Sequence, residues 1–361
     1  MPRAAILTSS VHPGDAVGHD TLLLAEELTG QGYQTGIFAD NWAAGLTGVR
    51  HYHGLAAHLT APDDLLIYQF ALGWEEALRL LRSVPCRRVV RYHNVTPPHF
   101  FHRLDMNYAL ACFDGRRQIA AVVAAGCEHY LADSEFNRGE LLEAGLDPRA
   151  ATVAPPLHRV EQLLAADADE AVLDRFQDGR TNWLAVGRIA PNKGHALLID
   201  AFARYRTHDP GARLLLAGGS DPRLEEYTAG LRRQAAALGV SDAVVFVGKV
   251  TESALKALYL AADVFVTASE HEGFCIPLVE AMAFKVPVVA YGTTAVPETL
   301  GGVGLVWDEP DPDLLAASVR KVVDDEALAV ALGTAGWQRY RHQFHNDRTR
   351  QIIRAVLRGA A

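Results

Sequence analysis

Residues 263–290, which read DVFVTASEHEGFCIPLVEAMAFKVPVVA, carry the clearest signal of the fold. The β-branched run at 263–267 predicts a buried strand, and the run at 286–290 predicts another. Between them, Pro277 suits the first turn of a helix, where its missing N–H leaves no hydrogen bond unmade. A strand, a helix and a second strand in this order are typical of a parallel α/β sheet.

The same alternation continues along the whole chain. Candidate strands lie at residues 4–9, 35–39, 65–69, 88–92, 129–132 and 151–153, and the pattern restarts at 182–186, 213–217, 243–247, 263–267, 286–290 and 304–307. The restart predicts two successive doubly wound, Rossmann-like domains, and 361 residues are enough for both. We assign residues 1–160 to the first domain, 179–339 to the second, and the acidic, alanine-rich stretch 161–178 to a linker.

Composition excludes several classes of protein. With 49% hydrophobic and 21% charged residues, the chain has enough apolar side chains for large cores. A net charge of −9 argues against general nucleic-acid binding, which requires a basic surface. The four cysteines are scattered, without the short spacings of a disulfide framework or a zinc ribbon; they are Cys86, Cys112, Cys127 and Cys275.

No apolar stretch of the sequence is long enough to span a bilayer, and the first residues read as a core strand, not a signal peptide. We therefore expect a cytoplasmic protein. A group of four arginines could approach the inner face of an anionic membrane or a phosphorylated acceptor, although a solvated strand edge explains these residues more simply; they are Arg82, Arg87, Arg88 and Arg91.

The loop at 273–278 has the features of an anion site. It connects a strand to a helix, and the unpaired N–H groups at a helix start favour negative charge. Glu280 lies about one turn inside that helix, where its carboxylate can accept both hydroxyls of a vicinal diol such as a ribose. Glu272 precedes the loop and would reach the other side of the same anion. The pattern suits a ligand that is part phosphate and part polyol.

A second strand-to-helix loop, AVGRIAPNKGH at 185–195, adds two cations. Arg188 offers a planar fork of donors and Lys193 a compact charge, and together they can bind a diphosphate. The loop is not a Walker loop, because no Ser or Thr follows Lys193 and its glycine to hold magnesium. Taken alone, this segment is explained more simply as a turn with surface cations; the glutamate loop in the same domain favours the diphosphate site.

These motifs resemble glycosyltransferase family 4, retaining enzymes of GT-B fold. The resemblance is carried by EGFCIPLVEAMAFKVPVVA, with seven residues between Glu272 and Glu280, and by VGRIAPNKG and FVGKV. In the first half it continues more loosely through VGH (17–19), YHNVTPP (92–98), GRRQI (115–119), ADSEFNRGELLEAG (132–145) and VAPP (153–156). It implies two Rossmann-like domains that face each other across a cleft, with a last helix, about 340–361, that packs back on the first domain.

The resemblance also implies a role for each matching position. Arg188 and Lys193 would hold the donor diphosphate and stabilise its growing charge, and Glu280 would bind the ribose. Glu272 would face the sugar, and main-chain groups around Lys249 would pair with the base. The implied catalytic residues are Glu272, His93, Arg188 and Lys193; the implied nucleotide-sugar contacts are Gly18, Arg188, Lys193, Lys249, Phe274, Cys275, Ile276 and Glu280.

Several residues have alternative interpretations. His93 would project toward the transferred sugar, but it could simply cap the turn before Pro97 and Pro98. His12 and His19 occupy the loop where an inverting relative would keep its base. Cys275 replaces a glycine common in the family, and a redox role stays open.

Asp311-Pro-Asp313 imitates the metal site of other glycosyltransferases. It directly precedes a predicted helix, so we expect Asp313 to be an N-cap. We expect no metal and no cofactor.

The sequence therefore predicts a retaining enzyme that moves a hexose from a UDP- or GDP-sugar to a hydroxyl of a glycan, lipid-linked or small-molecule acceptor. A nucleotide-sugar epimerase of the same architecture and a non-catalytic nucleotide-sugar-binding protein are the alternatives. A NAD-dependent dehydrogenase is disfavoured, because no GxGxxG follows any candidate strand.

Overall fold

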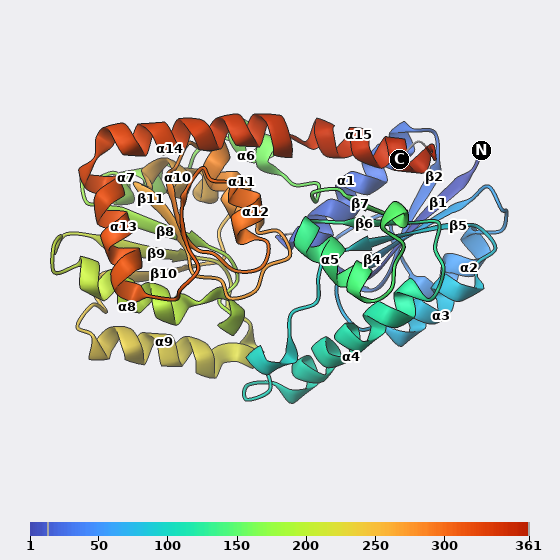
Figure 1. The fold of residues 1–361 in the computed structure, drawn as a ribbon, viewed down its shortest axis with the longest axis horizontal. Helices are drawn as coiled ribbons and strands as arrows, with labels where there is room; N and C mark the ends of the chain where they lie inside the picture. Colours follow the sequence, from blue (N-terminus) through green and yellow to red (C-terminus); the bar gives the residue numbers. More distant parts are fainter. Residues whose placement is uncertain (13, 360–361) are drawn as a thin grey trace. The chain divides into compact units, whose positions relative to one another are not determined.

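The computed structural model describes residues 1–12 and 14–359, which form two compact units, each built on its own parallel sheet (Figure 1). Unit 1 comprises residues 1–99, 107–158 and the chain from Asn346 onward, and unit 2 comprises residues 100–106 and 159–345. The chain leaves unit 1 after His158 and returns to it at Asn346, and these two residues are hydrogen-bonded to each other. The Asn346 side chain accepts from the His158 N–H at 3.1 Å and donates to the His158 carbonyl at 2.6 Å.

The unit 1 sheet has seven strands, and every pair is parallel. In spatial order the strands are β3 (Val49–His51), β2 (Gln34–Trp42), β1 (Arg3–Val11), β4 (Leu65–Phe70), β5 (Arg87–Tyr92), β6 (His129–Ala132) and β7 (Ala151–Val153). The order reverses direction between β1 and β4. Ligands of doubly wound sheets bind at the carboxyl ends of the strands at this kind of switch point.

Alternating residues of these strands are buried in two cores, one on each face of the sheet. Ala5 and Leu7 of β1 face one core, while Ala4 and Ile6 face the other. The first core is covered by α2 (Leu55–His58), α3 (Glu75–Ser83), α4 (Met106–Val123) and α5 (Glu135–Glu143), and the second by α1 (Ala16–Gly30) and α15 (Asn346–Leu357). Three-residue 3₁₀ turns lie at Tyr52–Gly54, Pro98–Phe100 and Pro148–Ala150.

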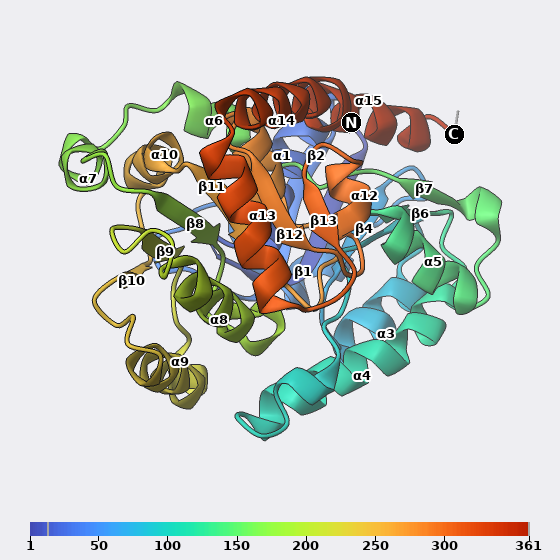
Figure 2. The ribbon, with the colours of Figure 1, turned by 60° about the vertical axis from the view of Figure 1, so that its left-hand side comes forward.

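The last helix, α15, belongs to unit 1, where it lies beside α1 (Figure 2). Ile353 and Val356 are buried in the same core as Leu24 of α1. Arg354 donates two hydrogen bonds, of 2.6 and 2.9 Å, to Glu27 of α1. Burial opposes the charge of Glu27, but hydrogen bonds from Arg354 and Gln31 and the charges of Arg354 and Arg350 together outweigh it and lower the pKa of this carboxyl.

Unit 2 has six parallel strands in the order of a Rossmann fold. They are β10 (Val244–Gly248), β9 (Arg213–Ala217), β8 (Asn182–Val186), β11 (Val264–Thr267), β12 (Val288–Tyr291) and β13 (Leu305–Trp307). The strand order reverses between β8 and β11. The two loops that the sequence singled out follow these two strands.

Helices cover both faces of this second sheet. On one face the core is closed by α8 (His195–Tyr205), α9 (Glu225–Ala237) and α13 (Pro312–Asp324). On the other it is closed by α6 (Val160–Ala165), α7 (Glu170–Phe176), α10 (Glu252–Ala261), α11 (Ile276–Ala283) and α12 (Val296–Leu300). α14 (Glu326–Arg339) runs into a π-helical turn, Tyr340–Phe344, and short 3₁₀ turns lie at Pro191–Lys193 and Pro222–Leu224.

Several sequence expectations differ from this structure. Residues 161–178 are not a free linker, because α6 and α7 bury Val160, Leu163 and Phe176 in the core of unit 2. Residues 340–345 belong to unit 2, so the return to unit 1 begins at Asn346, and residues 100–106, expected in the first domain, also belong to unit 2. The cap of α13 is Asp311, whose side chain accepts from two backbone N–H groups of the first turn. No described helix is long and apolar enough to cross a membrane.

Candidate active site

The loop after β11 carries Glu272 and leads into α11 through an unusual backbone turn. Cys275, the residue before α11, has φ of 75°, in the left-handed region that favours glycine. Glycine adopts this conformation without strain, and glycine is the residue that the sequence resemblance implies at this position. Burial raises the pKa of the Cys275 thiol, and the neighbouring Glu272 charge adds to the effect, so the thiol stays protonated.

The loop after β8 lies against the end of β11. Gly194 has φ of 64°, and a Cβ atom there would come within 1.9 Å of the Ala268 carbonyl oxygen. Asn192 reinforces the contact, because its carbonyl accepts from the Glu270 N–H at 2.8 Å and its side chain donates to the His271 carbonyl at 3.3 Å. The two predicted loops therefore meet at the switch point of the unit 2 sheet.

This packing brings Lys193 and Glu272 together. Lys193 Nζ lies 2.6 Å from Glu272 Oε1, with the side chains 25% and 9% exposed. Burial opposes the charge of Lys193, but the carboxylate outweighs it and raises the pKa of Lys193. Arg188 is exposed, and its charge lies near enough to oppose that of Lys193. Two cations and one carboxylate thus gather at the ends of β8 and β11.

Glu280 lies one turn into α11, as predicted, and has a partner that the sequence did not reveal. Tyr259 of α10 donates to Glu280 Oε2 at 2.7 Å and stacks on Phe284 with ring centroids 5.2 Å apart. Burial raises the pKa of Glu280 to about 7, although the Tyr259 hydrogen bond works against this shift. Tyr259 and Glu280 are 21 residues apart on different helices, so no sequence spacing could indicate the pair.

The predicted main-chain contacts lie in the same unit. Phe274 is buried against Phe344, and its carbonyl accepts from Thr299 Oγ1 at 2.7 Å. None of the hydrogen bonds found in the described residues uses the N–H groups of Cys275 or Ile276, which leaves both as donors at the start of α11. Lys249 is exposed and directly follows β10.

Gly18 lies in the first turn of α1, in unit 1. A Cβ atom at this position would come within 2.4 Å of the His12 carbonyl oxygen. The glycine is thus required by the loop that precedes its own helix. His12 Nε2, in this loop, lies 2.9 Å from Asn41 Oδ1, and His19, which the structure places within α1, accepts from the Gly14 N–H at 3.1 Å.

His93 lies just beyond the end of β5, in unit 1, and its side chain is only 4% exposed. Its Nδ1 is 2.8 Å from Asp133 Oδ2, and its Nε2 makes a short hydrogen bond with Gln69 Oε1. Both ring nitrogens therefore contact protein groups. His93 therefore does not use its ring to cap the turn before Pro97, which was the alternative considered from the sequence.

The arginine group predicted from the sequence is not a continuous basic surface. Arg91 is fully buried and ion-paired with Asp20 at 2.7 Å. Arg88 donates to the carbonyls of Ala125 and Gly126, and Arg82 to that of Ala121. β5 is buried from Val89 to Tyr92, so Arg91 lies inside, whereas Arg87 and Arg88 at the start of the strand are partly exposed.

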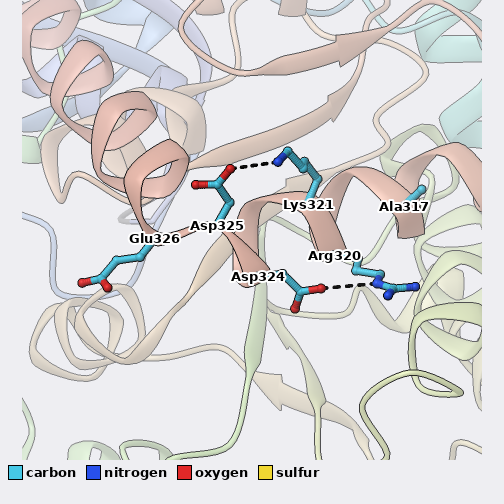
Figure 3. Close-up of a pocket in the computed structure, with 6 residues that line it drawn as sticks. All are labelled: Ala317, Arg320, Lys321, Asp324, Asp325 and Glu326. Atoms are coloured by element: carbon cyan, nitrogen blue, oxygen red, sulfur yellow. Dashed lines mark hydrogen bonds and ion pairs between the residues drawn. The ribbon is translucent and has the colours of Figure 1, made fainter.

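A surface groove of about 590 Å³ lies elsewhere in unit 2, between α13 and α14 (Figure 3). Its lining residues are Ala317, Arg320, Lys321, Asp324, Asp325 and Glu326. The cations pair with the acids one turn away, at 3.3 Å for Arg320–Asp324 and 2.8 Å for Lys321–Asp325. None of the predicted site residues lines this groove. Within the described residues, no group of three or more His, Cys, Asp or Glu side chains is placed to hold a metal ion.

Comparison with known proteins identifies the family and the fold that this chain resembles. Residues 174–339 match the family described as Glycosyl transferases group 1. The chain is 30% identical over 255 residues to the mannosylfructose-phosphate synthase of Agrobacterium fabrum, covering 68% of this chain and 56% of that protein. It is 32% identical over 282 residues to the D-inositol 3-phosphate glycosyltransferase of Acidothermus cellulolyticus, covering 73% and 61%. The chain thus spans less than two thirds of either relative.

The fold is also that of a solved structure. HepE from Anabaena, in complex with UDP-glucose, superposes with a TM-score of 0.80 at 18% identity, covering 99% of this chain and all of that one. At this identity the likeness shows the fold alone. The family match and the relatives show that this chain belongs to the group 1 glycosyl transferases, the family that its sequence motifs resemble, and the superposition shows its GT-B fold.

Proposed function

We propose that this protein is a retaining glycosyltransferase that moves a hexose from a nucleoside-diphosphate sugar to a hydroxyl acceptor. The observation that carries the proposal is the meeting of Lys193 and Glu272 at the switch point of the unit 2 sheet, 2.6 Å apart and partly exposed. In a doubly wound sheet this is where a ligand binds. Arg188 lies in the same loop, and Glu280 follows one turn into α11.

Each part of a nucleotide sugar finds a matching group in unit 2. A diphosphate is bound by Lys193, by the Arg188 fork and by the N–H donors at the start of α11. The ribose diol donates to Glu280, whose Oε1 is left available because Tyr259 occupies Oε2. When the diphosphate binds Lys193, Glu272 loses its partner and accepts from hydroxyls of the sugar.

The proposed transfer breaks the bond between the anomeric carbon and the diphosphate oxygen, which keeps the electron pair. Lys193 and Arg188 stabilise this charge, and they do so without a metal ion. The acceptor hydroxyl bonds to the anomeric carbon from the same face, and its proton passes to the departing diphosphate. Retention follows because both bonds lie on one face of the sugar.

The relatives suggest the first substrates to test. The two curated relatives are named for a fructose phosphate and an inositol phosphate, and HepE was solved with UDP-glucose. We propose UDP- and GDP-hexoses as donors and phosphorylated polyols as the first acceptors, followed by glycan and lipid-linked hydroxyls.

The test is to incubate the protein with α-linked UDP- and GDP-hexoses, with and without these acceptors, in EDTA. Transfer with an α-linked product by NMR is expected. A β-linked product would overturn retention, and an absolute need for magnesium or manganese would overturn the metal-independent mechanism. Interconversion of the donor without an acceptor would identify an epimerase. Tight binding without turnover of any donor would identify a binding protein.

A further inference from the structure

A closed cluster of charged side chains lies at the carboxyl ends of β4, β5 and β6 in unit 1. Asp20 of α1 is fully buried; its carboxylate accepts from Arg91 Nε and Nη2, both at 2.7 Å. Arg91 Nη2 also lies 4.0 Å from Asp133 Oδ1. His93 completes the cluster, with its Nδ1 on Asp133 and its Nε2 on Gln69. The four charged side chains are at most 5% exposed.

The orientation of the Gln69 amide is fixed by its other neighbour. Gln69 Nε2 lies 2.9 Å from Asp20 Oδ2, and an ionised carboxylate can only accept hydrogen bonds. The atom of Gln69 that faces Asp20 must therefore be its NH₂ group. As a consequence, the atom of Gln69 that faces His93 Nε2 is the carbonyl oxygen, which is also an acceptor.

The other ring nitrogen of His93 is constrained in the same way. Asp133 Oδ2 lies 2.8 Å from Nδ1, and Asp133 Oδ1 lies 4.0 Å from Arg91 Nη2, so the carboxylate lies between two nitrogen donors. A neutral imidazole has one N–H donor and one bare nitrogen, so it satisfies only one of two acceptors. The imidazolium form, with two N–H groups, satisfies both.

We propose that His93 is held as an imidazolium at neutral pH, and that Asp133 and Gln69 are the positioning residues that keep both of its ring nitrogens protonated. A ligand oxygen that reaches His93 Nε2 then meets an N–H donor. In the absence of a ligand, this N–H donates to Gln69 Oε1. His93 cannot serve as a general base in this state. The role in transfer rests on the proposed function, whereas the protonation state does not.

The surrounding charges are consistent with this state. Burial works against the charge of His93, but Asp133 and then Asp20 outweigh it, and the pKa of His93 is raised despite opposition from Arg91. Burial likewise opposes the charge of Asp20, and Arg91 and His93 outweigh it, so the pKa of Asp20 is lowered. Two cations and two carboxylates balance within one buried cluster.

The first experiment is an NMR titration of the full-length protein labelled with ¹⁵N at its histidines, with His93 assigned from the signal lost in His93→Gln. At pH 7 we expect two similar ring-nitrogen shifts for His93, as in an imidazolium. His129 in the same unit is the internal control, because it lies 2.8 Å from Thr152 Oγ1 and burial lowers its pKa. A single protonated nitrogen on His93 at pH 7 would overturn the proposal without any further variant.

Two variants test the positioning residues. Asp133→Asn removes the carboxylate and should lower the midpoint of the His93 titration by about one pH unit or more. Gln69→Met removes the acceptor at Nε2 and should lower it less. Thr152→Val is the matched control; it changes the partner of His129 and should leave His93 unchanged.

An unchanged His93 midpoint in folded Asp133→Asn would overturn the assignment. The two proposals can fail separately. An imidazolium in a protein that transfers no sugar would overturn the proposed function alone. A neutral His93 in an active transferase would overturn only the present inference.

Discussion

The polar cluster of unit 1 and that of unit 2 are built from the same kinds of side chain, but they differ in how far these side chains are shielded from solvent. In unit 1, Asp20 and Arg91 are fully buried, and His93 and Asp133 complete a balanced set of four charges. In unit 2, Lys193 is 25% exposed and is paired with one carboxylate, that of Glu272. A closed cluster holds its members in place, whereas a partly open pair can exchange partners with a ligand. The difference assigns to the first cluster the positioning of its own members, His93 included, and to the second the binding of a diphosphate.

Two buried histidines make the same point. His93 and His195 are both almost fully shielded from solvent, yet their pKa values shift in opposite directions. Burial, together with the neighbouring Lys193 charge, lowers the pKa of His195 to about 4. At His93 two carboxylates reverse the effect of burial. The charge of a buried histidine therefore depends on its partners and not on burial alone.

The largest expected effect comes from breaking the closed cluster. Asp20→Asn leaves Arg91 buried without its main counter-charge and should cost about 3–5 kcal/mol of unfolding free energy. Urea denaturation measures this loss, and amide hydrogen exchange should locate it in unit 1, because the units have separate cores. A loss below about 1 kcal/mol would mean that the cluster is not the structural element described above.

The next effect concerns the open pair. Lys193→Met should lower kcat roughly 10²-fold, if the cation supplies about 3 kcal/mol of transition-state stabilisation. Arg188→Ala should also lower kcat. Lys321→Met, in the exposed groove of the same unit, is the matched control and should leave kcat unchanged. A rise in KM alone for Lys193→Met would limit this residue to ground-state binding.

A smaller effect should appear as a pH dependence of nucleotide binding. Because the pKa of Glu280 is raised to about 7, its carboxylate is mostly protonated at pH 6 and mostly ionised at pH 8. The ionised form accepts from the ribose diol, so affinity for a nucleoside diphosphate should rise with pH, by up to about tenfold from this group. Calorimetry at both pH values measures the change.

Glu280→Gln is the control for this titration. It keeps the shape of the side chain and the titration of the ligand's phosphates, but it removes the ionisable carboxyl. The part of the pH dependence that belongs to Glu280 should disappear in this variant. An identical pH dependence in the two proteins would show that Glu280 does not bind the ribose in its ionised form.

Local patterns were sufficient for most of the fold. Runs such as Leu214–Leu216 are apolar on both faces, as buried parallel strands require, and twelve of the described strands lie at or near their predicted positions. β3 (Val49–His51) was not predicted, because it has three residues, two of them exposed, at the sheet edge. β12 begins at Val288, after Pro287, which has no N–H for the ladder.

The sequence was sufficient to identify the two loops of the site, but not the side chains that form hydrogen bonds with the site residues. Lys193 and Glu272 lie in loops that motifs identify, and the order of strands explains why the loops meet. Tyr259, Asp20 and Gln69 were not predicted, because each acts through a residue 21 to 73 positions away on another element. Such pairs depend on packing between elements, which periodicity and spacing do not encode.

The smallest expected effect comes from exposed pairs, and it sets the scale for the buried ones. In the groove of Figure 3, Arg320 is 59% and Asp324 47% exposed, at a distance of 3.3 Å. Exposed i,i+4 pairs contribute about 0.3–0.5 kcal/mol, and the order Arg before Asp is the less favourable one. Asp324 also ends α13, where a negative charge meets the negative end of the helix dipole. Arg320→Ala should therefore change the unfolding free energy by no more than about 0.5 kcal/mol, measured by urea denaturation beside Asp20→Asn. If both substitutions changed the unfolding free energy by similar amounts, burial would not explain the different contributions of the two kinds of ion pair. The contrast between the closed cluster and the open pair would then have no physical basis.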